Sequence, residues 1–129
     1  KAIASTYAQL IGNYSPALAD SFLTSNFTDT SDSINALADI ILGSVTFPSK
    51  EAFETSQANS LKIPLFVTSI NAVTCDTLVL RWTQTFGPSN QPVAGISILI
   101  LIWDEAKWKL KTLYTEFNSL TYFQNTGGN

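Results

Sequence analysis

The acid–base chemistry open to this 129-residue chain is narrow, because it contains no histidine and a single cysteine, Cys75. Histidine-based triads and nearly all zinc sites are therefore excluded. Proton transfer would have to use Asp, Glu, Tyr, Lys or the one cysteine. Cys75 stands in the turn "TCD", without neighbours that would make it a metal ligand or a nucleophile. The positions of the carboxylates and tyrosines therefore decide what the protein could do.

The last predicted hairpin brings one carboxylate and one tyrosine together. A tight turn over residues 104–107 pairs its two tryptophans, and their face should lie under helices, because the opposite face begins with lysines. The same register pairs Ser97 with Tyr114 and Gly95 with Glu116 on this inner face. A carboxylate in such an apolar setting would have the raised pKa that a general acid or base requires. Alternatively, Glu116 is a structural residue bonded to a tyrosine or to the backbone.

The preceding hairpin extends the inner face. Its register places Gln84 opposite Gly95 and Trp82 opposite Ser97. Two small residues in the central strand leave room, and polar groups surround the gap, so the pattern predicts a pocket. A β-bulge would shift part of this register.

Composition and charge bound the class of protein. Hydrophobic residues make up 45% of the chain, charged residues only 13%, and the formal net charge is -3. These values indicate a single globular domain over residues 1–129. With seven Lys and Arg residues and no basic stripe, nucleic acid is not an expected partner. No apolar run approaches the roughly 20 residues of a membrane span, so no membrane partner is expected either.

Hydrophobic periodicity and turn signals divide the chain into helices followed by strands. The helices are predicted over 3–14, from Pro16 with Ser15 as the cap, over 34–42 before Gly43, and from Pro48-Ser49 to about 59. The strands are predicted over 65–73, 77–86, 93–103 and 107–117. Short connections make these strands an antiparallel meander, and the fold class is α+β with helices on one sheet face.

The stretch "GISILILIW", from Gly95 to Trp103, does not alternate between apolar and polar residues as a half-exposed strand should. A large apolar patch is rarely left exposed on a monomer, so we expect a homodimer through the outer sheet face. The alternative is partial cover by Arg81, lysine stems or the C-terminal tail. The residues expected in this patch are Ile96, Ile98, Ile100, Leu113 and Phe117.

Several stretches resemble the nuclear transport factor 2-like superfamily, which includes SnoaL-like and ketosteroid-isomerase-like proteins. They are "YAQLIGNYSPALADSFLTSNFTDTSDSIN", "FPSKEAF", "AVTCDTLVLRWTQTFG" and "KLKTLYTEFNSL". Within the superfamily they are similar to small secreted proteins of filamentous fungi. The resemblance implies a cone-shaped fold, three to four helices on the concave face of a curved sheet of at least four strands, a pocket between them, and frequent dimerisation.

The resemblance also implies pocket residues. The superfamily often contributes an acid from the segment after the second helix, and here that segment offers Asp29 and Asp32. Asp32 could instead cap the following helix, and Asp29 could be a solvated loop residue. Tyr14 ends the first helix on its apolar face, as a ligand contact or as part of the core.

Secretion is the expected localisation. Two glycosylation sequons begin at Asn13 and Asn26, and the resemblance to secreted proteins points the same way. It further suggests that Cys75 pairs with an upstream cysteine outside this chain.

Two functions remain open at this point. The first is a secreted protein that binds a small apolar molecule without a cofactor, with Tyr14, Asp32, Trp82, Gln84, Ser97 and Tyr114 as ligand contacts. The second is a metal-free isomerase, cyclase, dehydratase or hydrolase that uses Glu116 or Asp29 as the catalytic carboxylate.

Overall fold

A computed structural model describes residues 2–128, which form five helices and five strands in one α+β fold. Over this range no helix combines the length and the hydropathy that a membrane span requires. The elements are α1 (Ala2–Gly12), α2 (Pro16–Phe22), β1 (Leu23–Thr30), α3 (Asp32–Ala38), α4 (Lys50–Ala58), β2 (Phe66–Val73), β3 (Thr77–Gln84), β4 (Val93–Asp104), β5 (Lys107–Phe117) and α5 (Ser119–Asn125).

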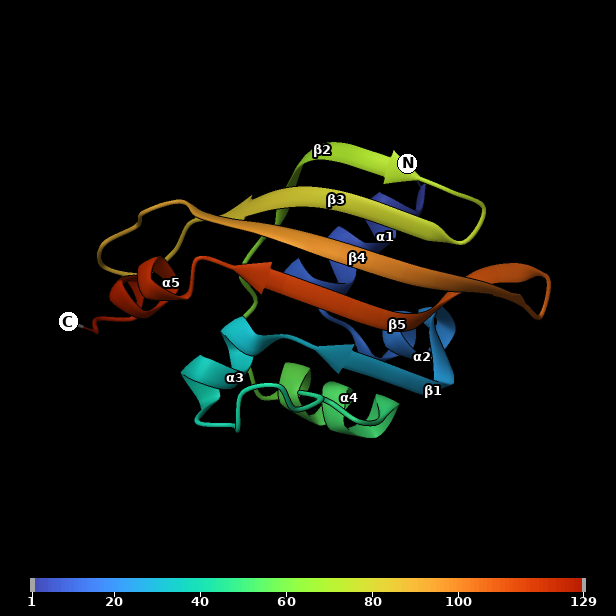
Figure 1. Cartoon of the computed structure of the whole chain (residues 1–129), viewed down its shortest axis with the longest axis horizontal. Coiled ribbons are helices and arrows are strands. Elements are labelled where there is room, and N and C mark those ends of the chain that lie inside the picture. Colours follow the sequence, from blue (N-terminus) through green and yellow to red (C-terminus); the bar gives the residue numbers. More distant parts are fainter. Residues whose placement is uncertain (1, 129) are drawn as a thin grey trace.

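The five strands form one sheet in the order β1-β5-β4-β3-β2 (Figure 1). The four strands of the second half make the predicted antiparallel meander. β1 adds a fifth strand that runs parallel to β5 and was not among the four predicted strands. α1 and α2 lie behind the sheet, whereas α5 lies across the end where β3 and β5 finish (Figure 1). The sequence did not predict α5.

Serine caps begin three of the helices, as the sequence predicts for Ser15. The Ser15 Oγ accepts a hydrogen bond from the Leu18 N–H at 3.2 Å, and Ser49 caps α4 in the same way. α3 is capped by Ser31 rather than by Asp32. α3 also ends four residues earlier than predicted, because Asp39 adopts a left-handed conformation with φ 60° and stops the helix before the exposed Ile41.

The hairpin of β4 and β5 contains a β-bulge. Trp103 pairs with Trp108 and Leu101 with Leu110, as predicted, but Ile100 then pairs with Thr112. Residue 111 is therefore an extra residue in β5. Because side chains alternate between faces, every β5 residue beyond the bulge points to the face opposite to the one predicted.

The bulge reverses the predicted faces of four residues in β5. Tyr114 and Glu116, expected on the inner face, lie on the outer face opposite Ile98 and Ile96. Leu113 and Phe117, expected in the outer apolar patch, point inward and join the core. The two tryptophans at the hairpin tip extend beyond the helices, so that Trp103 remains 59% exposed instead of being covered.

The pairing of β3 with β4 is displaced by two residues from the prediction, which leaves the faces unchanged. Trp82 pairs with Gly95, and Gln84 pairs with Val93. Gly95 is required at this position, since a Cβ there would lie 2.2 Å from the Trp82 ring. The inner face of the sheet is therefore closely packed around Trp82 and becomes hollow farther toward β1 and the helices.

Candidate functional site

A cavity of about 260 Å³ lies between the inner face of the sheet and the helices. Leu61 and Ala38 line it and are also exposed, so they mark its mouth. The aromatic residues of its wall are Tyr7, Phe47, Phe53, Trp82, Phe117 and Tyr122. The aliphatic residues are Ile11, Ile34, Leu37, Ala38, Leu61, Ile63 and Leu113, and the polar ones are Asp29, Ser56, Ser60, Gln57, Gln84 and Thr115.

Beneath the cavity, the hydroxyl of Ser97 joins three elements. Its Oγ lies 2.7 Å from the Tyr7 hydroxyl of α1 and 3.2 Å from the Thr115 hydroxyl of β5. It also accepts a hydrogen bond of 2.9 Å from the Trp82 indole N–H. All four residues are buried, and a buried polar network whose members are satisfied holds its side chains in one arrangement.

Tyr7 contributes a neutral hydroxyl to the cavity. Burial, the largest cause, raises the pKa of Tyr7 to about 12, and the negative charge of Asp29 adds to the rise. The hydrogen bonds from Ser97 and Thr115 act in the opposite direction but are weaker. At neutral pH Tyr7 therefore carries its proton and serves as a hydrogen-bonding group, not as a base.

Asp29 is the acid that the fold places in this cavity. Its backbone N–H and C=O pair with Phe47 at 3.0 and 2.9 Å, and β1 pairs it with Leu113 of β5. These contacts fix the side chain inward, where the residue is only 2% exposed. Its Oδ1 atom accepts no hydrogen bond from any of the described residues. A buried carboxyl oxygen without a partner is rare in folded proteins and calls for an explanation.

Burial raises the pKa of the Asp29 carboxyl from 3.8 to about 7, and the charge of Glu116 contributes a smaller rise. The carboxyl group therefore changes between its neutral and ionised forms near neutral pH. Such a group can donate a proton at slightly acid pH and accept one at slightly alkaline pH. The segment after α2 thus places one acid, Asp29, in the interior.

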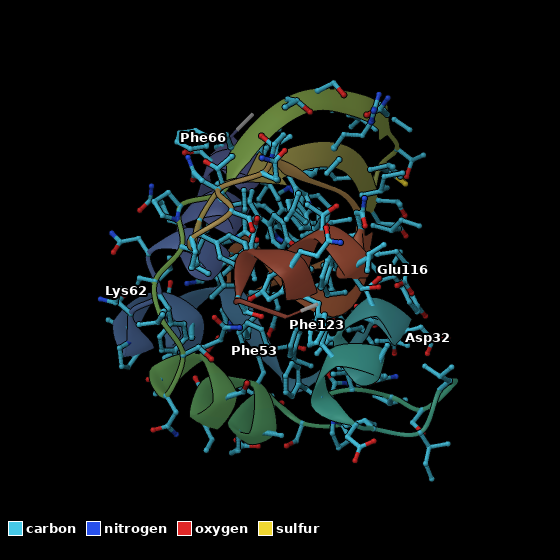
Figure 2. All side chains as sticks on the ribbon, turned by 90° about the vertical axis from the view of Figure 1, so that its left-hand side faces the viewer. Asp32, Phe53, Lys62, Phe66, Glu116 and Phe123 are labelled. Atoms are coloured by element: carbon cyan, nitrogen blue, oxygen red, sulfur yellow. The ribbon has the colours of Figure 1, made fainter. Side chains whose placement is uncertain are left out.

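Glu116 and Asp32 lie outside the cavity, side by side at the surface (Figure 2). The Glu116 carboxylate accepts hydrogen bonds from the Ser33 hydroxyl at 2.6 Å and from the backbone N–H groups of Ser33 and Asp32 at 2.9 and 3.1 Å. It thus holds the first turn of α3 against β5. The prediction that Glu116 faces the pocket is wrong, and the structural alternative describes its surroundings.

The remaining predicted contacts divide between the cavity and other parts of the fold. Trp82 and Gln84 line the cavity as predicted, and Gln84 donates a hydrogen bond to the Ile63 carbonyl at 3.0 Å. Ser97 lies behind the wall, in the network with Tyr7. Tyr14 is a core residue away from the cavity, and burial followed by the charges of two nearby acids raises its pKa. Tyr114 is 46% exposed on the outer face.

Several cavity residues were not predicted from the sequence, although the sequence contains one signal for them. In β5 the apolar residues fall on even positions at 108 and 110 and on odd positions at 113 and 117. This change of parity locates the bulge and would have turned Thr115 and Phe117 inward. Tyr122 lies in α5, and it was not predicted because the short sequence "SLTYFQN" has no strong helical pattern.

Asp29 is the only ionisable carboxyl or amine group among the described residues that line the cavity. Within residues 2–128, no three His, Cys, Asp or Glu side chains come close enough to hold a metal ion. The cavity thus offers an apolar enclosure, a few neutral hydrogen-bonding groups and one carboxyl. This combination suits small-molecule binding and proton transfer.

Comparison with known proteins places this architecture in a family. Residues 1–129 match the family description of an NTF2-like domain. The chain belongs to the NTF2-like family. A comparison with curated proteins gives no match.

Solved structures share the fold of this NTF2-like domain at low sequence identity. A hypothetical protein with a ketosteroid isomerase-like fold from Catenulispora acidiphila DSM 44928, solved with trimethylamine, has a TM-score of 0.74 at 10% identity, over 98% of this chain and 93% of its own. A candidate polyketide cyclase from Bacillus cereus ATCC 10987 has a TM-score of 0.70 at 17% identity, over 96% and 77%. A candidate isomerase of the SnoaL-like family from Agrobacterium tumefaciens C58 gives 0.60 at 11% identity, over 91% and 95%.

The burial of Asp29 predicts how the stability of this NTF2-like domain depends on pH. Between pH 4 and 7 the folded state retains a proton on Asp29 that the unfolded chain has lost, so stability falls as pH rises. At about 1.4 kcal/mol per pKa unit, the ionised carboxyl costs roughly 4 kcal/mol above pH 7. We expect Asp29→Asn to gain stability relative to wild type as pH rises from 4 to 8, by up to that amount.

Urea denaturation over this pH range measures the difference. Asp39→Asn is the matched control, because Asp39 is exposed and asparagine readily takes the left-handed conformation of that residue. The same pH dependence in Asp29→Asn and in wild type would contradict the account of the buried carboxyl.

Proposed function

We propose that this protein binds a small, largely apolar molecule in the cavity between the sheet and the helices. The observation that carries this proposal is the composition of the cavity wall, in which aromatic and aliphatic side chains surround a few polar groups. Ligand sites typically have this composition, with the polar groups fixing the orientation of the ligand. Water interacts weakly with a wall of this kind, so the transfer of an apolar ligand from water into the cavity is favourable in free energy.

The comparisons agree with a small-molecule site in general terms. The structure from Catenulispora acidiphila contains trimethylamine, and other similar proteins carry names of cyclases and isomerases, whose substrates are small molecules. At 10% to 17% identity these proteins share the fold with this chain, so the identity of the ligand has to come from the cavity itself.

The proposal predicts that Trp82 reports ligand entry. Trp103 and Trp108 lie exposed at the hairpin tip, so their replacement by phenylalanine leaves Trp82 as the single indole. N-phenyl-1-naphthylamine is a neutral apolar probe that accepts excitation from tryptophan. We expect it to quench Trp82 fluorescence in a saturable titration and to brighten as it leaves water.

Two variants of α3 distinguish the cavity from the surface. Ala38→Phe narrows the entrance and should weaken probe binding by about tenfold, the effect of roughly 1.4 kcal/mol. Ala36→Phe makes the same substitution two residues earlier on the same helix, but Ala36 is exposed and does not line the cavity, so binding should stay unchanged. Equal weakening in both variants, or no saturable quenching in the parent, would count against the proposal.

Asp29 supports a second candidate function, a metal-free isomerase or cyclase. Asp29 lines the cavity and its pKa is about 7, so its carboxyl group can take a proton from a carbon beside a carbonyl and return it. Tyr7, whose hydroxyl is neutral, lines the same cavity. Glu116 is no longer a candidate for this role, because it lies on the outer face.

Hydrogen–deuterium exchange at the carbon beside the carbonyl of 2-tetralone in D₂O, followed by NMR, tests proton abstraction. An active carboxylate should accelerate exchange with a pH midpoint of about 7. Asp29→Asn should lose roughly 10²–10⁴ in rate, while Asp39→Asn retains it. Exchange no faster than in buffer would leave binding as the function of the cavity.

We further propose that the outer sheet face forms a homodimer. Without Leu113 and Phe117, the apolar patch consists of Ile96, Ile98 and Ile100 of β4 together with Tyr114 of β5. Three of these residues, Ile96, Ile98 and Tyr114, are more than one-third exposed, which favours a second copy as cover.

Replacing Ile96 and Ile98 with lysine should convert the dimer to a soluble monomer, since a typical interface buries about 800 Å² on each partner. The control is lysine at Ile41 and Leu42, which are more exposed still but lie in the segment after α3. Analytical ultracentrifugation at micromolar concentration measures the result. A monomeric wild type would refute this prediction.

Secretion as part of the small fungal branch stays a prediction from the sequence. Asn13 and Asn26 are both exposed, as glycosylation requires, and Cys75 is exposed and free within the described residues. Mass spectrometry of the native protein reads out glycosylation at both sequons and the pairing of Cys75 with a cysteine outside this chain.

A further inference from the structure

The cavity also indicates which class of small molecule it takes, an inference that rests on the proposed binding function. We propose that the ligand is a small organic cation of the alkylammonium type, whose charged nitrogen lies against the Asp29 carboxylate while its carbon substituents contact the aromatic wall. This inference assigns the charge and chemical class of the ligand, beyond its being largely apolar.

The first support is the state of the Asp29 carboxyl. Its Oδ1 is buried and accepts no hydrogen bond from the described residues, although the fold can supply donors to a carboxylate, as α3 does for Glu116. A buried charge without a partner is unfavourable, and a cationic ligand would provide the missing partner.

The second support is the absence of a compensating positive charge. No lysine or arginine is found among the described residues that line the cavity, and the chain has no histidine. An anionic ligand would therefore lie beside a like charge with no counterion, which is strongly disfavoured. Neutral and cationic ligands remain, and only a cation would match the ionised form of Asp29.

The third support is the aromatic wall. Tyr7, Phe47, Phe53, Trp82, Phe117 and Tyr122 all line the cavity, and the faces of such rings attract cations. The rings of Phe47 and Phe53 meet edge to face at 5.8 Å, next to the backbone bridge between Phe47 and Asp29. Aromatic rings gathered around the charged group are the arrangement by which quaternary ammonium ligands are recognised.

Charges on the surrounding elements strengthen the preference for a cation. Glu116 of β5 acts on Asp29 with a negative charge, and Tyr7 of α1 stays neutral. On α4, Lys50 pairs with Asp20 at 3.4 Å, and neither Lys50 nor the glutamates of that helix line the cavity. Tyr122 of α5 is neutral as well, because burial raises its pKa.

Benzyltrimethylammonium and its carbon isostere 2,2-dimethylpropylbenzene test the inference, with Trp82 fluorescence in the variant that lacks the two exposed tryptophans. The cation keeps its charge at every pH, so any pH dependence comes from the protein. Between pH 8 and pH 6 the ionised fraction of Asp29 falls from about nine-tenths to one-tenth, so the affinity for the cation should fall by about tenfold. The isostere should bind equally at both pH values.

Asp29→Asn should bind the cation at least tenfold more weakly than the parent at pH 8 and leave the isostere unaffected. Asp39→Asn, which removes the same charge at the surface, should behave like the parent. If Asp29→Asn binds the cation as tightly as the parent, or if only the isostere binds, the inference is overturned while the proposed binding function stands. If neither compound binds and N-phenyl-1-naphthylamine also fails to bind, both proposals fall together.

Discussion

One buried hydroxyl group holds the cavity side of this fold together. Ser97 sits in the middle of β4, surrounded by isoleucine and leucine, and its Oγ contacts Tyr7 of α1, Trp82 of β3 and Thr115 of β5. Through these side-chain hydrogen bonds α1 is joined to the centre of the sheet. An apolar residue at position 97 would leave the Trp82 indole N–H without a hydrogen-bond partner. It would also remove the closest hydrogen-bond partner of the Tyr7 hydroxyl. The cavity wall therefore keeps its shape because the buried part of β4, otherwise apolar, retains one polar residue.

The bulge in β5 makes this arrangement possible and also determines what lies on the other face. With the extra residue at 111, Thr115 points inward to meet Ser97, and Glu116 points outward. Glu116 then reaches the first turn of α3 and accepts hydrogen bonds from Ser33 and Asp32. Since α3 supplies Ile34 and Leu37 to the cavity wall, a carboxylate on the outer face positions part of the inner site.

Local signals in the sequence were enough to predict the first four helices, the meander and the faces of Trp82 and Gln84. Serine caps, turn residues and the alternation of side chains in β3 act over a few residues and can be recognised without knowledge of the fold. The positions of Tyr114 and Glu116 could not be obtained in that way, because a single inserted residue reverses every face beyond it. The parallel pairing of β1 with β5, and the contribution of α5 to the cavity wall, depend on contacts between distant segments. Asp29 was identified from the family resemblance, and its burial depends on that same pairing.

A comparison of Asp29 with Glu116 shows that this fold does supply hydrogen-bond donors to a carboxylate, so their absence at Asp29 Oδ1 is specific to that position. Glu116 lies where solvent could satisfy it, yet it receives three hydrogen bonds from α3. Asp29 is almost completely buried, and its Oδ1 receives none from the described residues. If the carboxyl had only a structural role, asparagine or leucine would fill the position without the cost of a raised pKa. Local destabilisation of this kind is typical of positions that a ligand or a reaction completes. The carboxyl of Asp29 is therefore the group through which this cavity can distinguish one small molecule from another, and the apolar wall around it sets how strongly its charge is felt.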